Sequence, residues 1–206
     1  MSSSAVEPRA IPSQSTLMAD STPTPPPPAA PDLRERRTRA FVWGMWALMT
    51  FVAMCVLFSY GRNIGMAEDW HMVAPLSGNE RSLASWTWSQ NNEHRVPLPR
   101  VILLTVLKIT NGDFRAGMVL NVLTLAGMAA AMMLTVRALR GGRSSLVDTI
   151  FPILFLNIGN WENMFWAWQF TFVLPAALTC ALLIVLLLRP ALSTIGAAAT
   201  AGGSAP

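Results

Sequence analysis

A cluster of arginines followed at once by a long uncharged run constrains this chain more than any other feature. Arg34, Arg36, Arg37 and Arg39 stand immediately before residues 40–60, a stretch of 21 residues with no charged side chain. A helix of about 20 apolar residues crosses the hydrocarbon core of a bilayer. Because basic residues concentrate on the cytoplasmic side of such spans, the cluster predicts a cytoplasmic N-terminus and an outer position for the residues that follow.

The composition supports a membrane protein. Only 13% of the 206 residues are charged and 52% are apolar, whereas soluble domains carry about 25% charged residues. The basic residues lie at the ends of apolar segments and form no stripe with interleaved aromatics, which argues against a nucleic-acid partner. Cys55 and Cys180 lie within apolar runs and suggest neither a disulfide framework nor a metal site.

The first 39 residues are predicted to be a disordered, Pro-rich cytoplasmic tail. Pro, Ser, Thr and Ala dominate it, and Pro25 to Pro28 form a short polyproline run. Such a segment has too few apolar side chains to form a core. Its apolar residues do not form the early block of a secretory signal.

Further apolar runs predict an all-α, multi-pass membrane domain over residues 40–189. Residues 118–136 form the second predicted span, in which Ala126 with Ala130 and Gly127 with Ala131 have the spacing of close helix contacts. Arginines 137, 140 and 143 follow this span and predict that the chain is again on the cytoplasmic side.

Residues 146–188 are too long for one crossing and have arginines on both flanks. An even number of crossings is therefore expected, with a short third span at 146–158 and a fourth at 170–188, both kinked by proline. Residues 190–206 are either a low-complexity tail or the start of a truncated fifth span. About four transmembrane helices result.

The first outer loop, residues 61–117, holds most of the polar side chains. Ser82–Gln90 is a predicted surface helix, and Pro99–Ile109 is a predicted interfacial helix that begins with proline. The pair Asn111-Gly112 predicts the end of this helix, and Asp113 is predicted to be the N-cap of the next helix.

The adjacent carboxylates Glu68 and Asp69 are the candidate catalytic residues. A carboxylate can take a proton from an acceptor hydroxyl, arginine forks suit phosphate oxygens, and tryptophan faces can stack on a sugar or an isoprenoid. The candidate substrate-binding residues are Glu93, His94, Arg95, Arg100, Arg115, Trp161, Glu162, Trp166 and Gln169.

Simpler interpretations stand beside these. The acidic pair suits a solvated loop, the tryptophans suit an interfacial belt, and Asp148 suits an N-cap. A divalent metal could use acidic and histidine residues 68, 69, 71, 93 and 94, although their spacing matches no ligand motif. Glu162 should share a helical face with Trp166 and Gln169 and pair with Arg95 or Arg115.

The pattern resembles the N-terminal part of the GT-C superfamily of multi-pass glycosyltransferases. The resemblance rests on the outer acidic pair Glu68-Asp69, the surface helix Pro99–Ile109, the segment Gly159–Asn163, and Asn92–Arg95 followed by Pro97. It implies inverting transfer of a sugar from a polyprenyl-phosphate donor, with Asp69 as the base and Glu68 as second candidate. The family's shared module has about seven spans and this chain has four, so the chain is expected to be a fragment or a shortened protein.

The sequence therefore predicts the N-terminal portion of an enzyme that acts on the outer face of the cytoplasmic membrane. Its expected partners are the lipid bilayer and the polyprenyl-phosphate sugar. The alternatives are a non-catalytic scaffold or assembly subunit, which would need a partner membrane protein, and a transporter fragment with Glu162 and Gln169 lining a path.

Overall fold

The computed structural model describes residues 33–201, and side-chain surroundings for residues 33–188. The predictions for residues 1–32 and 202–206 lie outside the described residues. Every element among the described residues is helical, and the only bridge joins Asn91 to His94. The all-α prediction is confirmed for this part of the chain.

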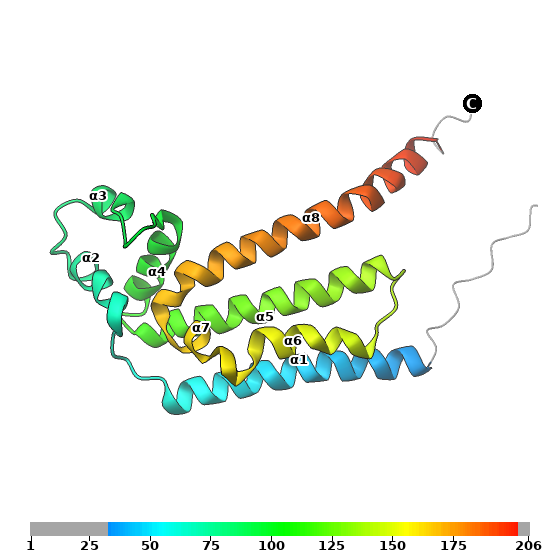
Figure 1. Cartoon of the computed structure of the whole chain (residues 1–206), viewed down its shortest axis with the longest axis horizontal. Helices are drawn as coiled ribbons and strands as arrows, with labels where there is room; N and C mark the ends of the chain where they lie inside the picture. Colours follow the sequence, from blue (N-terminus) through cyan, green and yellow to red (C-terminus); the bar gives the residue numbers. More distant parts are fainter. Residues whose placement is uncertain (1–32, 202–206) are drawn as a thin grey trace, which may run out of the picture. The chain divides into compact units, whose positions relative to one another are not determined.

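Figure 1 shows the helical elements, coloured by their order in the chain and with the α-helices labelled. Their bounds are α1 Leu33–Tyr60, η2 Ala67–Met72, α2 Val73–Ser77, α3 Leu83–Trp88, α4 Pro97–Ile109, α5 Phe114–Leu139, η3 Leu146–Thr149, α6 Ile150–Leu156, η4 Ile158–Asn160, α7 Trp161–Phe165, η5 Ala167–Gln169 and α8 Phe170–Ala201. Elements marked η are short 3₁₀ helices of three to six residues.

Among the described residues, three helical stretches are long and apolar enough to cross a membrane. They are Leu33–Tyr60, Phe114–Leu139 and Ala167–Leu188, and they contain the first, second and fourth predicted spans. The predicted third span, residues 146–158, forms η3 and the short helix α6, which ends before the extended backbone of Asn157. At 1.5 Å per residue α6 alone is about 10 Å long, so it cannot cross a membrane by itself.

The broken segment between α5 and α8 nevertheless runs back along α5. At its start Arg140 pairs with Asp148, and at its end the Nδ2 of Asn121 donates to the carbonyl of Trp166. Asn121 and Arg140 are about 28 Å apart along a helix of this length. In Figure 1 the segment lies beside α5 and α1. We call the end with Arg140 and the start of α1 the arginine end, and the end with residues 61–113 and 157–170 the loop end.

Helix α5 is central to the packing, because α1, α6 and α8 all contact it. Its Val122, Leu125 and Ala126 are buried. The indole Nε1 of Trp46 donates to the carbonyl of Ala126 at 2.9 Å, which gives this group a partner where water is scarce. The predicted contact through Gly127 is wrong, because a Cβ added there would meet nothing within 4 Å.

A second core lies at the loop end. Helix α4 starts at Pro97, two residues before the predicted start at Pro99, and buries Leu103, Leu104 and Leu107 on one face. These leucines pack with Trp86 and Trp168. The helix predicted within Ser82–Gln90 is present as α3.

The ends of the helices follow the predicted signals with one exception. Asn111 and Gly112 have positive φ and end α4, and the Asp113 carboxylate accepts from the Arg115 N–H as the N-cap of α5. At η3 the N-cap is Ser145 and not Asp148. Asp148 is the third residue of that turn, and its carboxylate accepts from the Ser145 N–H.

Gly117 marks the closest approach of three elements. A Cβ added there would lie 2.7 Å from the Ala167 Cβ and 2.9 Å from the Leu103 Cδ1. Helix α5 therefore meets both α4 and η5 at a position without a side chain. This contact brings the start of α8 close to the first loop.

We predict that Gly117→Ala lowers the free energy of unfolding by about 1–3 kcal/mol, because the added methyl overpacks this contact. Gly127→Ala is the matched control in the same helix, at an open position, and should be neutral or stabilising because alanine favours helix by about 1 kcal/mol over glycine. Denaturant unfolding in detergent micelles measures both. Equal effects of the two substitutions would contradict the described packing.

Candidate functional site

Asp69 joins the first loop to the start of α8. Its side chain is fully buried. Its Oδ2 accepts from the Met66 N–H at 3.0 Å, and its Oδ1 accepts from the Trp168 N–H at 2.8 Å. Trp166 adds a third link, because its Nε1 donates to the Met66 carbonyl at 3.2 Å. We call these three hydrogen bonds the Asp69 latch.

The electrostatics of Asp69 reflect this position. Burial raises the pKa of Asp69 to about 6, and the Glu68 charge adds to the rise, whereas the backbone hydrogen bonds from Met66 and Trp168 lower the pKa. A general base must lie within hydrogen-bond reach of the substrate proton. With no exposed surface, Asp69 holds the backbone in this conformation, and its catalytic role stays a prediction.

Glu68 has a different environment from its neighbour. It is half-buried, and its Oε2 is buried without a hydrogen-bond partner. It lines a cavity of about 340 Å³, which we call the Glu68 pocket. Polar residues on its wall are Glu68, Asn91, Asn92, His94 and Thr171, and the larger apolar residues are Trp166, Trp168, Phe172 and Pro175. A carboxylate oxygen deprived of water and of protein donors favours a ligand that brings a donor.

A tight turn holds the polar side of the Glu68 pocket. The Asn91 N–H donates to the His94 carbonyl at 2.8 Å, and the His94 N–H donates to the Asn91 carbonyl at 3.0 Å. Asn92 has a φ of 51°, which asparagine tolerates better than most residues. Glu93 is exposed at the tip of this turn, and Arg95 is exposed directly after it. Of the predicted ligands in this motif, the structure places His94 on the pocket wall.

Arg100, a predicted substrate ligand, is an internal residue. It is 2% exposed, and its Nη1 donates to the carbonyls of Trp86 at 2.7 Å and Ser89 at 2.6 Å. The guanidinium also lies over the rings of Trp86 and Trp168, and burial lowers the pKa of Arg100. Arg100 therefore fixes α3 against α4. The i, i+3, i+4, i+7 spacing of Arg100 with Leu103, Leu104 and Leu107 could have revealed this from the sequence.

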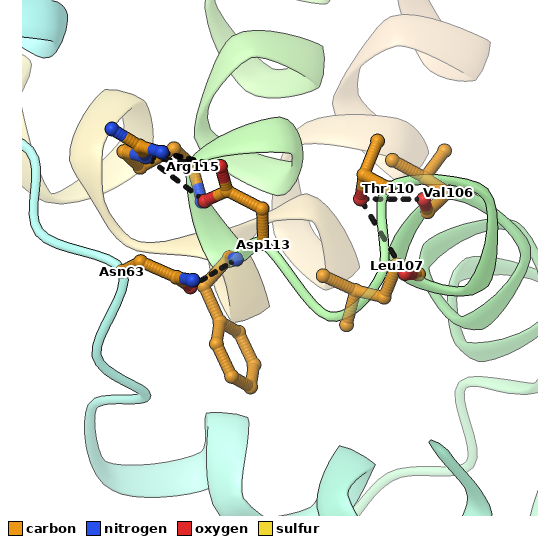
Figure 2. A network of polar contacts seen from close by, with 7 residues as sticks. Asn63, Val106, Leu107, Thr110, Asp113 and Arg115 are labelled. Carbon is orange, nitrogen blue, oxygen red and sulfur yellow. Dashed lines mark hydrogen bonds and ion pairs between the residues drawn. The ribbon is translucent and has the colours of Figure 1, made fainter.

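Figure 2 shows Arg115 beside Asp113 at the start of α5. Its Nε and Nη2 bind Asp113 in a fork with distances of 2.9 and 2.6 Å, and the Phe114 N–H donates to the Oδ1 of Asn63. The ion pair faces a separate cavity of about 470 Å³ beside Phe58. Arg115 thus pairs with Asp113 and not with Glu162.

The predicted shared face of Glu162, Trp166 and Gln169 is wrong. Helix α7 ends at Phe165, and Trp166 has extended backbone with φ −123° and ψ 117°, so helical spacing does not continue to Gln169. Glu162 and Trp161 are exposed. Trp161 lines another cavity beside Arg62, whereas Trp166 reaches the Glu68 pocket.

The described residues contain no group of three His, Cys, Asp or Glu side chains that could hold a metal ion. The residues proposed for the metal site make different contacts and do not form one cluster. Asp69 belongs to the latch, the His71 ring lies 5.9 Å from the Trp168 ring, and His94 lines the Glu68 pocket.

Asn121 is a site-organising residue that the sequence analysis missed. It is fully buried in α5, and its Nδ2 donates to the Trp166 carbonyl at 2.8 Å. This bond supports the extended backbone that turns Trp166 towards the Glu68 pocket. An amide within an apolar span was the available signal, because such groups usually find partners between helices.

We predict that substitution of Asp69 destabilises the protein, whereas substitution of its neighbour Glu68 leaves stability almost unchanged. Asp69→Asn keeps the side-chain size but offers one acceptor oxygen, so the Met66 or Trp168 N–H loses its partner, which costs about 1–3 kcal/mol. Glu68→Gln breaks no protein hydrogen bond and should change the free energy of unfolding by less than about 0.5 kcal/mol. Thermal unfolding in detergent measures both. A destabilised Glu68→Gln beside an unaffected Asp69→Asn would contradict the assignment of the latch.

The chain was also compared with protein-family models, with curated proteins and with solved structures. None of the three comparisons found a match. The chemistry of the Glu68 pocket is therefore the basis of the proposed function.

Proposed function

We propose that this membrane protein binds a polyprenyl-phosphate sugar in the Glu68 pocket and takes part in sugar transfer, with Glu68 as the general base. One observation carries the proposal. Glu68 lines a pocket that has both polar and apolar walls, and its Oε2 is buried without a hydrogen-bond partner. Asp69 then acts as the residue that fixes the backbone next to the base.

The two kinds of wall suit an amphiphilic ligand. Phe172 and Pro175 belong to the apolar stretch of α8 that is long enough to cross a membrane, and Phe172 is 56% exposed. An isoprenoid chain could lie on these side chains while the phosphate and sugar face His94 and the two asparagines. The faces of Trp166 and Trp168 offer stacking surfaces for the sugar.

The proposed step is an inverting displacement. Glu68 takes the proton of an acceptor hydroxyl, whose oxygen forms a bond to the anomeric carbon of the donor sugar. The bond between that carbon and the phosphate oxygen breaks, and its electron pair leaves with the polyprenyl phosphate. Glu68 then returns the proton to water. The resemblance to the GT-C superfamily favours Asp69 for this role, whereas the pocket favours Glu68.

The proposal includes four passes through the cytoplasmic membrane. Helices α1, α5 and α8 would supply three, and the broken segment over residues 146–166 would supply the fourth. Supporting this, Arg140 and Arg143 follow α5 at the end where α1 begins with its own arginines. The rule that basic residues stay cytoplasmic then puts the loop end outside.

The exposed surfaces of α1 and α8 favour additional membrane helices around this domain. Only 17% of the residues in the apolar window of α1 and 11% in that of α8 are buried, against 44% for α5. Lipid could cover these surfaces. Further spans of a longer enzyme, or a partner subunit, would do so in the proposed glycosyltransferase.

Photo-crosslinking tests where the donor binds. The probe is a polyprenyl phosphate with a diazirine in its isoprenoid chain, added to the protein in nanodiscs. We expect saturable labelling of the peptide that contains Phe172 and Pro175, with competition by unlabelled polyprenyl phosphate. Labelling that does not saturate, or that avoids α8, would refute the lipid site.

Transfer activity tests the role of Glu68. In membranes that contain the full-length protein, Glu68→Gln should lower sugar release from the donor by about 10²–10⁴ without loss of crosslinking. Glu80→Gln is the matched control, because Glu80 lies in the same loop and outside the Glu68 pocket. Transfer by Glu68→Gln within twofold of the wild type would eliminate the general-base role. Saturable crosslinking with no transfer by the wild type would favour a lipid-binding scaffold.

A further inference from the structure

A second polar cavity lies at the arginine end, far from the Glu68 pocket. It has a volume of about 480 Å³. Its walls come from the first turns of α1 and from the connection between α5 and η3: Arg34, Glu35, Thr38, Arg143, Ser144 and Ser145. Nothing in the proposed transfer reaction uses this cavity.

Hydrogen bonds fix the two walls relative to each other. The Oε1 of Glu35 accepts from the Ser144 N–H at 2.8 Å, across 109 residues of sequence. The Oδ2 of Asp148 accepts from the Ser145 N–H at 2.8 Å, and Asp148 also pairs with Arg140. The connection can turn back to α1 because Gly141 and Gly142 have φ values of 65° and 87°, which suit glycine. These hydrogen bonds therefore fix the connection between α5 and η3, which forms one wall of the cavity.

The lining of this cavity is rich in donors for an anion. Arg34 and Arg143 contribute guanidinium groups, and Thr38 and Ser145 contribute hydroxyls. Among the described residues that line the cavity, Glu35 is the one with an acidic side chain, and the Ser144 N–H partly satisfies its carboxylate. Guanidinium groups match the oxygens of phosphate better than any other side chain.

Apolar side chains continue from the polar cavity. Leu146 lines the cavity and is 58% exposed, and Val147 beside it is 69% exposed. These residues begin the segment that packs along α1 and α5, so they lie at the edge of the membrane domain. A ligand with a phosphate attached to an acyl chain suits both surfaces.

We infer that this cavity binds the headgroup of an anionic phospholipid, with its phosphate between Arg34 and Arg143 and an acyl chain over Leu146. The bilayer that surrounds the chain supplies the ligand. The site is separate from the Glu68 pocket, because the two lie at opposite ends of α5. A lipid there would hold the start of α1 against the connection after α5.

Native mass spectrometry of the full chain, released from mixed micelles, measures lipid retention. The probes are phosphatidylglycerol and phosphatidylcholine with identical acyl chains. We expect phosphatidylglycerol to be retained preferentially by the wild type. A hydrogen bond to a charged group contributes about 1.5 kcal/mol, or about tenfold, so the double variant Arg34→Gln/Arg143→Gln should weaken retention by about 100-fold.

The matched control is Arg36→Gln/Arg37→Gln, which removes the same number of positive charges, from the turns of α1 that follow Arg34, but outside the cavity. It should weaken retention by less than about threefold, because neither side chain lines the cavity and neither can hydrogen-bond the bound phosphate. Equal losses in both double variants would show general attraction to anionic lipid and overturn the site. Equal retention of the two lipids by the wild type, a result that needs no variant, would also overturn it.

The water-soluble headgroup glycerophosphoglycerol separates a lipid from a free phosphate ester. It should compete at least tenfold more weakly than phosphatidylglycerol, because it lacks the chain that contacts Leu146. Equal competition would show that the cavity binds a soluble phosphate ester and not a lipid. Crosslinking of the polyprenyl phosphate probe at α8 should not change in Arg34→Gln/Arg143→Gln, which distinguishes failure of this site from failure of the proposed function.

Discussion

The buried carboxylate of Asp69 is the interaction on which the loop end depends. It accepts hydrogen bonds from two backbone N–H groups, that of Met66 three residues before it and that of Trp168 99 residues after it, just before α8. Without this acceptor, both N–H groups would lie unpaired beside tryptophan rings and apolar side chains, at a cost of about 1–3 kcal/mol each. The raised pKa of Asp69 shows that burial of the charge outweighs these hydrogen bonds. The latch thus holds the first loop against the start of α8 at an electrostatic cost.

The latch also separates two acids that are neighbours in the sequence. In the 3₁₀ turn η2, Asp69 points into the protein, whereas Glu68 lines a pocket. Arg100 shows the same principle among the basic residues, since its guanidinium holds α3 by backbone carbonyls. A charged residue whose type suits catalysis can therefore have a structural role instead, in which it holds the backbone of the site in place. Of the two neighbouring acids, Glu68 is the one with a carboxylate oxygen that has no hydrogen-bond partner, so it is the better candidate for contact with a ligand.

The sequence predicted the long apolar helices, because length and absence of charge depend only on local residues. It also predicted α4 from its proline and the end of α4 from Asn111-Gly112. It could not predict the break at Trp166, which depends on hydrogen bonds to Asn121 and Met66 from distant parts of the chain. The Asp69 bond to the Met66 N–H is local and was within reach of sequence analysis. The bond to Trp168 is not, because no pattern in the chain relates positions so far apart.

Cysteine accessibility tests most directly whether residues 61–113 and 157–170 share one end of the membrane domain, outside the cell. Single cysteines replace Ser77, Asn160 or Ser144 in a protein that carries Cys55→Ala and Cys180→Ala. On intact cells an impermeant maleimide should label the cysteines at positions 77 and 160, and should label position 144 only after permeabilisation. Labelling of positions 77 and 160 from opposite sides, or of position 144 on intact cells, would contradict this arrangement.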